Sequence, residues 1–128
     1  MSKDLRNPLA RARGLGSAKE GVSHWMLQRI TALALVFLTV WFVATMLRLT
    51  HTDYATARAT LAQPWNAVLL IALIATMFRH AVLGMQVVIE DYVHTRWLEV
   101  ASLVLIKFIA VLAALAGVLA VLRIALGS

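Results

Sequence analysis

Two ionisable side chains, Arg79 and His80, lie deep inside a long apolar run of the sequence. If that run is a helix across a bilayer, His80 lies roughly 15 Å from the end marked by Glu90, at the rise of an α-helix. Ionisable groups at such a depth are costly and face the protein interior or a cavity. A neutral imidazole ligates haem iron well, and the chain has no cysteine to compete with it. His80 is therefore either a haem ligand or a histidine that is hydrogen-bonded between helices.

One helical face carries His80 together with three residues that follow it. At 100° per residue, positions 80, 84, 87 and 91 fall within roughly 40° of one another. Gly84 removes a side chain one turn from His80, so that a flat macrocycle or another helix can approach closely. The spacing alone does not choose between a ligand and plain helix packing.

The same run ends in Glu90-Asp91-Tyr92, three residues with polar side chains. Carboxylates are disfavoured at the C-terminus of a helix by its dipole, so we expect a partner group, such as an arginine, to hold them. Tyr92 offers a hydroxyl at the membrane interface, where aromatic residues are common. A quinone head group would need a hydrogen-bond donor at the same place. An interfacial anchor and a quinone contact both remain open for Tyr92.

Other basic side chains near these positions could hold an anionic group. Arg79 has no acidic partner inside the apolar runs, and a buried guanidinium without a counterion is disfavoured. We expect it to meet a haem propionate, a carboxylate of a partner, backbone carbonyls or water. His24 and Arg29 precede the first apolar run beside Trp25, where they could bind an anionic group or lipid phosphate.

The elements that must position these residues are three apolar runs, at about 30–49, 65–89 and 100–126. The chain has 128 residues, of which 62% are hydrophobic and 14% charged, too apolar a balance for an ordinary soluble domain. About 20 residues span the hydrocarbon, so each run is long enough to cross it. Residues 50–64 are expected to be a polar loop. The sequence predicts an all-α integral membrane protein with three transmembrane helices, and the lack of cysteine excludes disulfides, iron–sulfur ligation and c-type haem attachment.

The positive charges predict how the helices cross the membrane. The N-terminal segment, residues 1–29, and the loop at 90–99 together carry seven lysines and arginines, against three on the other side. The seven are Lys3, Arg6, Arg11, Arg13, Lys19, Arg29 and Arg96, and the three are Arg48, Arg58 and Arg123. Because positive residues favour the cytoplasm, we expect the N-terminus to be cytoplasmic and the C-terminus to lie outside. The net charge of +6 is thus a feature of membrane topology and does not indicate nucleic-acid binding.

Three helices with buried polar groups are expected to complete their packing with other subunits. The third run is rich in small residues, which permit close contact between helices. These are Ala110, Ala113, Ala114, Ala116, Gly117 and Ala120. They could face a partner subunit or pack within this chain. Lys107, near the start of the run, is expected to extend back toward the 90–99 loop.

Residues 80–94 closely resemble the second-helix signature of the small membrane anchor subunit (the D subunit) of succinate dehydrogenase, respiratory complex II. The pattern is a histidine, a glycine four residues later, and an Asp-Tyr pair eleven and twelve residues later, as in His80, Gly84, Asp91 and Tyr92. The segment from Gly21 to Ala32 is similar to the family's entry into its first helix. The resemblance covers roughly residues 14–126, whereas Arg79 is not part of the pattern.

This resemblance implies roles for individual residues. His80 would be one axial ligand of a b-type haem, and a cytochrome b-type companion anchor subunit would supply the other. Tyr92 would donate a hydrogen bond to ubiquinone, and Asp91 would orient a partner arginine beside it. His24 and Arg29 would lie near the haem propionates. The iron–sulfur and flavoprotein subunits would dock on the cytoplasmic side.

The resemblance also implies a place and a limited chemical role for the chain. Residues 1–29 would be a cytoplasmic segment, and residues 30–126 an anchor domain in a bundle completed by the companion subunit, in a bacterial inner membrane. Succinate oxidation would occur on another subunit, so this chain would only position cofactors. Two alternatives are a fumarate reductase anchor, possibly without haem, and a small transporter or adaptor that uses Arg79 and His80 for an anion or protons.

Overall fold

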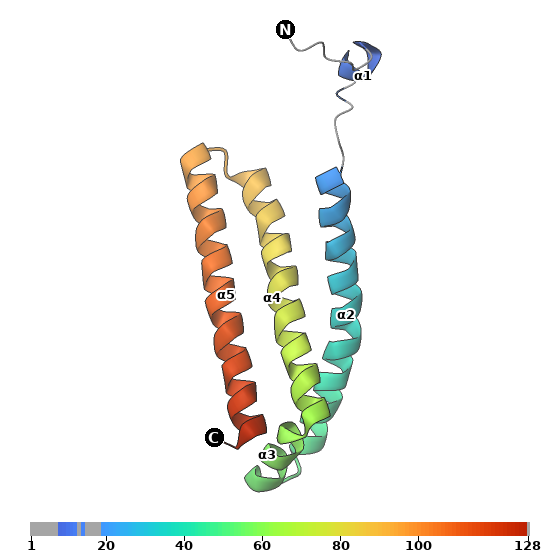
Figure 1. Cartoon of the computed structure of the whole chain (residues 1–128), viewed down its shortest axis with the longest axis vertical. Coiled ribbons are helices and arrows are strands. Elements are labelled where there is room, and N and C mark those ends of the chain that lie inside the picture. Colours follow the sequence, from blue (N-terminus) through green and yellow to red (C-terminus); the bar gives the residue numbers. More distant parts are fainter. Residues whose placement is uncertain (1–7, 13, 15–18, 128) are drawn as a thin grey trace.

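Three long helices cross the structure side by side, and a short helix joins the first two at one end (Figure 1). The computed structural model describes residues 8–12, 14 and 19–127. Its helices are α1 (Pro8–Ala12), α2 (Lys19–Leu49), α3 (Tyr54–Ala62), α4 (Pro64–Tyr92) and α5 (Arg96–Leu126). Several basic residues of the charge argument, Lys3, Arg6 and Arg13, lie outside the described residues. The prediction of an all-α fold with three long apolar helices is confirmed.

All three long helices have the length and composition to cross a membrane, over Gly21–Leu49, Pro64–Tyr92 and Arg96–Leu126. They extend beyond the predicted runs: α2 is helical from Lys19, and α5 begins at Arg96. The predicted polar loop at 50–64 is wrong, because most of it forms α3. Asp53 caps that helix by accepting hydrogen bonds from the backbone N–H of Ala55 at 3.2 Å and of Thr56 at 3.4 Å.

The ends of the long helices follow from local chemistry. Pro64 occupies the first turn of α4, where its missing N–H costs nothing and its fixed φ suits the helix. Gly127 ends α5 with φ 75°, a left-handed conformation that glycine adopts without strain. Only the residues Val93 to Thr95 separate α4 from α5, so the two helices run antiparallel as neighbours.

Helix α4 lies in the middle of the layer and packs against both α2 and α5. A single layer of helices has little interior, and the buried apolar residues in the described part of the chain are Ala67, Val82, Leu83, Ile89 and Val121. Most other apolar side chains are exposed on the two broad faces. In a membrane such faces contact lipid or other helices, so exposed apolar surface is available for the helices of a partner subunit.

The contact between α4 and α5 is close and apolar. A Cβ atom on Gly117 would lie 3.3 Å from Cδ1 and 3.4 Å from Cγ2 of Ile74, so any side chain here would press on Ile74 and glycine favours this close approach. Among the small residues of the third apolar run, Gly117 therefore packs within the chain. Ala116 and Ala120 on the same helix remain exposed and available to a partner.

Candidate functional site

The seam between α2 and α4 carries polar side chains from both helices. His80 of α4 is half-buried, and its Nδ1 lies 2.9 Å from the hydroxyl oxygen of Thr31 on α2. Thr31 is the buried polar residue of the described chain, with 7% of its surface exposed. The hydrogen bond between helices that the sequence left open for His80 is thus present. It engages one ring nitrogen, and no hydrogen bond to the other is found among the described residues.

A groove lies between the same two helices, one turn from His80 toward the Tyr92 end. Its volume is about 610 Å³. Its walls come from α2 and α4. The lining residues are Gly21, His24, Trp25, Gln28, Gly84, Gln86, Val87 and Glu90.

Two polar atoms at this groove are buried without a partner. Among the described residues, neither Nε2 of His24 nor Oε1 of Gln28 has a hydrogen-bond partner. An unpaired buried polar group costs about 1–3 kcal/mol, so such atoms are rare unless something else satisfies them. Both side chains line the groove, which makes a polar ligand or a partner group the natural complement.

Gly84 keeps the groove open on the side of α4. A Cβ atom at this position would have one atom near it, the Nε2 of Gln28 at 3.8 Å. This distance is an ordinary contact, so α2 does not need glycine here for packing. Gly84 therefore differs from Gly117, whose missing side chain is filled by Ile74. The empty space at Gly84 fits the flat approach that the sequence left open.

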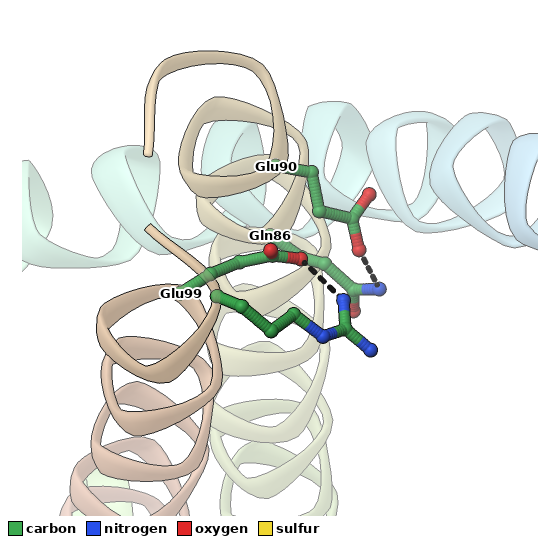
Figure 2. A network of polar contacts seen from close by, with 4 residues as sticks. Gln86, Glu90 and Glu99 are labelled. Carbon is green, nitrogen blue, oxygen red and sulfur yellow. Dashed lines mark hydrogen bonds and ion pairs between the residues drawn. The ribbon is translucent and has the colours of Figure 1, made fainter. Parts of the chain in front are cut away.

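The polar groups at the far end of the groove are paired. Gln86 donates a hydrogen bond to Oε1 of Glu90 at 2.8 Å, one turn along α4 (Figure 2). On α5, Arg96 lies 3.5 Å from Oε1 of Glu99, in an exposed ion pair of the first turn. The contact with Gln86 holds Glu90 at the rim, although the dipole of α4 disfavours a carboxylate there.

The predicted site residues fall into two groups. His80, Gly84 and His24 lie together along the seam between α2 and α4. Arg29 is exposed and lies over the ring of Trp25, with its guanidinium carbon 5.4 Å from the ring centroid.

Asp91 and Tyr92 form the second group at the exposed end of α4. Tyr92 is 80% exposed, and Asp91 is exposed as well. Neither is among the residues that line the groove between α2 and α4. Within the described residues, no group of three or more His, Asp or Glu side chains could hold a metal ion. A metal bound through His80 would thus need ligands from elsewhere.

Arg79 lies beside other clefts. It lines one between α2 and α4, and another of 420 Å³ between α4 and α5. Lys107 lines the second cleft too, rather than reaching only toward the loop before α5. No ion pair involving either side chain occurs in the described part of the chain, and Arg79 is exposed.

Thr31 and Gln28 were not singled out from the sequence. Together with His24 they occupy positions 24, 28 and 31 of α2. This is the i, i+4, i+7 spacing of one helical face. That spacing of polar residues inside an apolar helix was the signal that could have found them.

Comparisons with known proteins agree with the family suggested by the residues around His80. Residues 3–114 match the succinate dehydrogenase/fumarate reductase transmembrane subunit family. A succinate dehydrogenase hydrophobic membrane anchor subunit of Rickettsia bellii is 37% identical over 121 residues, covering 94% of this chain and 97% of the relative. The same subunit of Rickettsia conorii is 32% identical over 121 residues, with 94% and 96% covered.

A more distant relative, the corresponding subunit of Paracoccus denitrificans, is 29% identical over 85 residues, covering 66% of each chain. No solved structure gives a significant match. With three apolar helices, a signature at 80–92 and a family match over most of its length, the chain belongs to the succinate dehydrogenase/fumarate reductase transmembrane subunit family.

Proposed function

We propose that this chain is the membrane anchor subunit of a succinate dehydrogenase, that it holds one side of a b-type haem, and that it contributes to a ubiquinone site. Its relatives in Rickettsia and Paracoccus carry the name of that anchor subunit. Their similarity supports the anchor role, and the side chains along α2 and α4 support the cofactor roles.

The observation that carries the haem proposal is the polar groove between α2 and α4. His80 lies one helical turn before Gly84 in the same seam, Gly84 leaves the wall of the groove flat, and His24 and Gln28 bring buried polar atoms without partners among the described residues. Buried polar atoms without partners are costly unless a ligand or a partner group meets them. A macrocycle with propionates fits this set of groups.

Three residues of this chain would hold the haem in different ways. His80 would hold the haem through a ring nitrogen, and a histidine of the companion anchor subunit would hold it from the other side. Nε2 of His24 can donate a hydrogen bond to a propionate, and Arg29 can reach the same side by leaving the ring of Trp25. The haem, when bound, would supply a centre for one-electron transfer.

The quinone site would form at the exposed end of α4. The Tyr92 hydroxyl is accessible there and can donate a hydrogen bond to a carbonyl oxygen of ubiquinone. Asp91 precedes it and would orient an arginine of a partner subunit. Reduction to ubiquinol takes two electrons and two protons, and water at the membrane surface would supply the protons. Because Asp91 and Tyr92 are exposed in this chain, partner subunits would build the remaining walls of the pocket.

The charge distribution supports an orientation for the whole complex. The end of the layer that carries Tyr92 and Arg96 would face the cytoplasm, together with the N-terminal segment. The flavoprotein and iron–sulfur subunits would then dock at this end, in a bacterial inner membrane. Electrons from succinate would pass through those subunits to the quinone.

The decisive experiment is a reduced-minus-oxidised visible spectrum of the complex purified through this chain in mild detergent. We expect a b-type haem signal, with flavoprotein and iron–sulfur subunits present. His80→Ala should remove or shift that signal, whereas His51→Ala should not, because His51 is exposed beyond the opposite end of α2. An unchanged spectrum in His80→Ala would exclude His80 as a ligand.

The same preparation separates the alternatives. Flavin-containing partners without haem would indicate a haem-free anchor of the fumarate reductase type. A complex with neither pigment nor partners would point instead to a transporter or adaptor.

The quinone proposal is tested by Tyr92→Phe, which removes the hydroxyl and keeps the ring. We expect succinate-dependent quinone reduction to fall by about 10-fold or more with assembly intact, since a catalytic hydrogen bond is worth on the order of 10²–10³ in rate. Tyr54→Phe is the matched control, because Tyr54 is the other tyrosine and starts α3 at the opposite end. Equal turnover in both variants would contradict the role of Tyr92.

A further inference from the structure

We propose that Thr31 is a positioning residue for His80: it accepts a hydrogen bond from Nδ1–H, fixes the imidazole as the tautomer with a free Nε2, and holds the ring plane in place. This inference rests on the proposed function, because it treats His80 as the haem ligand. It adds a specific role for a residue of α2 that the family signature at 80–92 does not contain.

The direction of the hydrogen bond follows from counting protons around the Thr31 hydroxyl. Its oxygen lies 2.8 Å from the carbonyl oxygen of Leu27, 3.0 Å from that of Gln28 and 2.9 Å from Nδ1 of His80. A hydroxyl has a single proton to donate. The carbonyl oxygens can only accept, and a helical threonine commonly donates to the carbonyl four residues earlier. With the proton directed at Leu27, the oxygen accepts from the imidazole.

This assignment has a direct chemical consequence for the ring. A neutral imidazole carries one N–H and one lone pair. If Nδ1 holds the proton, the lone pair is on Nε2, which is the atom that can bind iron. A hydrogen bond from the second ring nitrogen also makes a ligating imidazole more basic and sets its orientation.

The position of Thr31 makes the contact rigid. Thr31 is 7% exposed, and it is tied to its own helix through two backbone carbonyls. Water therefore has little access with which to replace the hydroxyl.

Helix α2 offers a matched control for the substitution. Thr45 donates to the carbonyl oxygen of Trp41 at 2.8 Å, as Thr31 does to that of Leu27, and is also partly buried. Its hydroxyl makes no hydrogen bond to another helix in the described part of the chain. Thr31→Val and Thr45→Val thus make the same chemical change in the same helix, and only the first removes the contact to His80.

The test uses the assembled complex carrying Thr31→Val, Thr31→Ser, Thr45→Val or His80→Ala. We measure the haem midpoint potential, the EPR g-values of the ferric haem and the rate of haem loss to excess apomyoglobin. Without the acceptor, His80 becomes a weaker donor to ferric iron, so the potential in Thr31→Val should rise. The g-values should shift because they report the angle between the axial rings, and haem loss should be faster by about 10-fold or more. Thr31→Ser, which keeps the hydroxyl, should match the wild type, as should Thr45→Val.

The outcomes separate this inference from the proposed function. If His80→Ala alters the haem while Thr31→Val equals Thr45→Val in potential and g-values, Thr31 has no positioning role and the inference is wrong. If His80→Ala leaves the haem unchanged, both the ligand assignment and the inference fall. If Thr31→Val does not accumulate, Thr31→Ala carries the same test, because it removes the hydroxyl without adding bulk against His80.

Discussion

The two seams beside α4 are built from different side chains, although the same helix forms one wall of each. On the α5 side, Ile74 fills the space left by Gly117, where an added Cβ atom would lie only 3.3 Å from Cδ1 of Ile74. On the α2 side, the space left by Gly84 is bordered by the amide end of Gln28 at 3.8 Å. Around Gly117 the first seam is closed by shape, although a cleft lined by Arg79 lies elsewhere along it, and at Gly84 the second seam is left open beside polar atoms.

This difference indicates which seam is structural and which is functional. In a membrane, apolar helices associate mainly through close packing, and the seam between α4 and α5 meets that requirement. Polar atoms such as Nε2 of His24 and Oε1 of Gln28 add nothing to packing when they lack partners, and they cost free energy. A chain that retains them on one side of α4 is expected to use them.

The largest expected effect is the contrast between Gly117→Leu and Gly84→Leu. A leucine at 117 must displace Ile74, so we expect the free energy of unfolding to fall by about 1–3 kcal/mol, the usual cost of overpacking. A leucine at 84 enters the groove, so it should lower that free energy far less while removing the haem signal of the complex. Unfolding in mixed micelles of SDS and mild detergent measures the first effect, and the visible spectrum measures the second. Similar losses of stability in both variants would contradict the distinction between the seams.

Much of the functional seam could be predicted from the sequence, because its residues are unusual for their surroundings. His80 and Gly84 stand out inside an apolar run, and helical periodicity places them on one face. The partner helix was harder to predict, since periodicity gives the face of each helix but not the rotation of one helix against the other. Thr31 meets His80 only through that rotation.

The connection between α2 and α4 shows a different limit of prediction. It is short and consists mainly of alanine and threonine, so neither an apolar stripe nor a membrane-length run marks α3. The available signal was Asp53, a good N-cap residue before a run rich in alanine. A long stretch without any structure would have been unusual in a compact chain, which was a second reason to expect a helix.

A smaller effect is expected from Gln28→Met, which replaces an amide by an apolar side chain of similar length. Since Oε1 of Gln28 is buried without a partner in the described chain, its removal should leave the free energy of unfolding unchanged or raise it by up to about 1 kcal/mol. The assembled complex should nevertheless lose haem faster, because a polar wall of the groove is gone.

Gln63→Met is the control for this change. Gln63 precedes α4 at the opposite end and is exposed, so neither haem retention nor stability should depend on its burial. A destabilised chain with normal haem retention in Gln28→Met would mean that this amide serves packing, and the two seams would then be alike.

The smallest expected effect concerns α3, which contacts α4 and α5 where their seam ends. Hydrogen bonds from the Thr56 side chain and then from its backbone N–H lower the pKa of Asp53 below 3.8. The carboxylate is therefore favoured in the folded chain, so its stabilisation of α3 is present above the ordinary pKa and is lost as the pH falls through the lowered one. Hydrogen exchange of the Ala55 and Thr56 amides should quicken over that acidic range in the wild type.

In Asp53→Ala the same amides should exchange quickly at every pH, because the cap is already absent. Exchange in α4 near Ile74 should be unaffected in either case, since the packing against Gly117 and not the cap holds α4 to α5. Faster exchange near Ile74 at acidic pH or in Asp53→Ala would contradict this expectation. The contact between α4 and α5 would then depend on α3 and not only on the packing of Ile74 against Gly117.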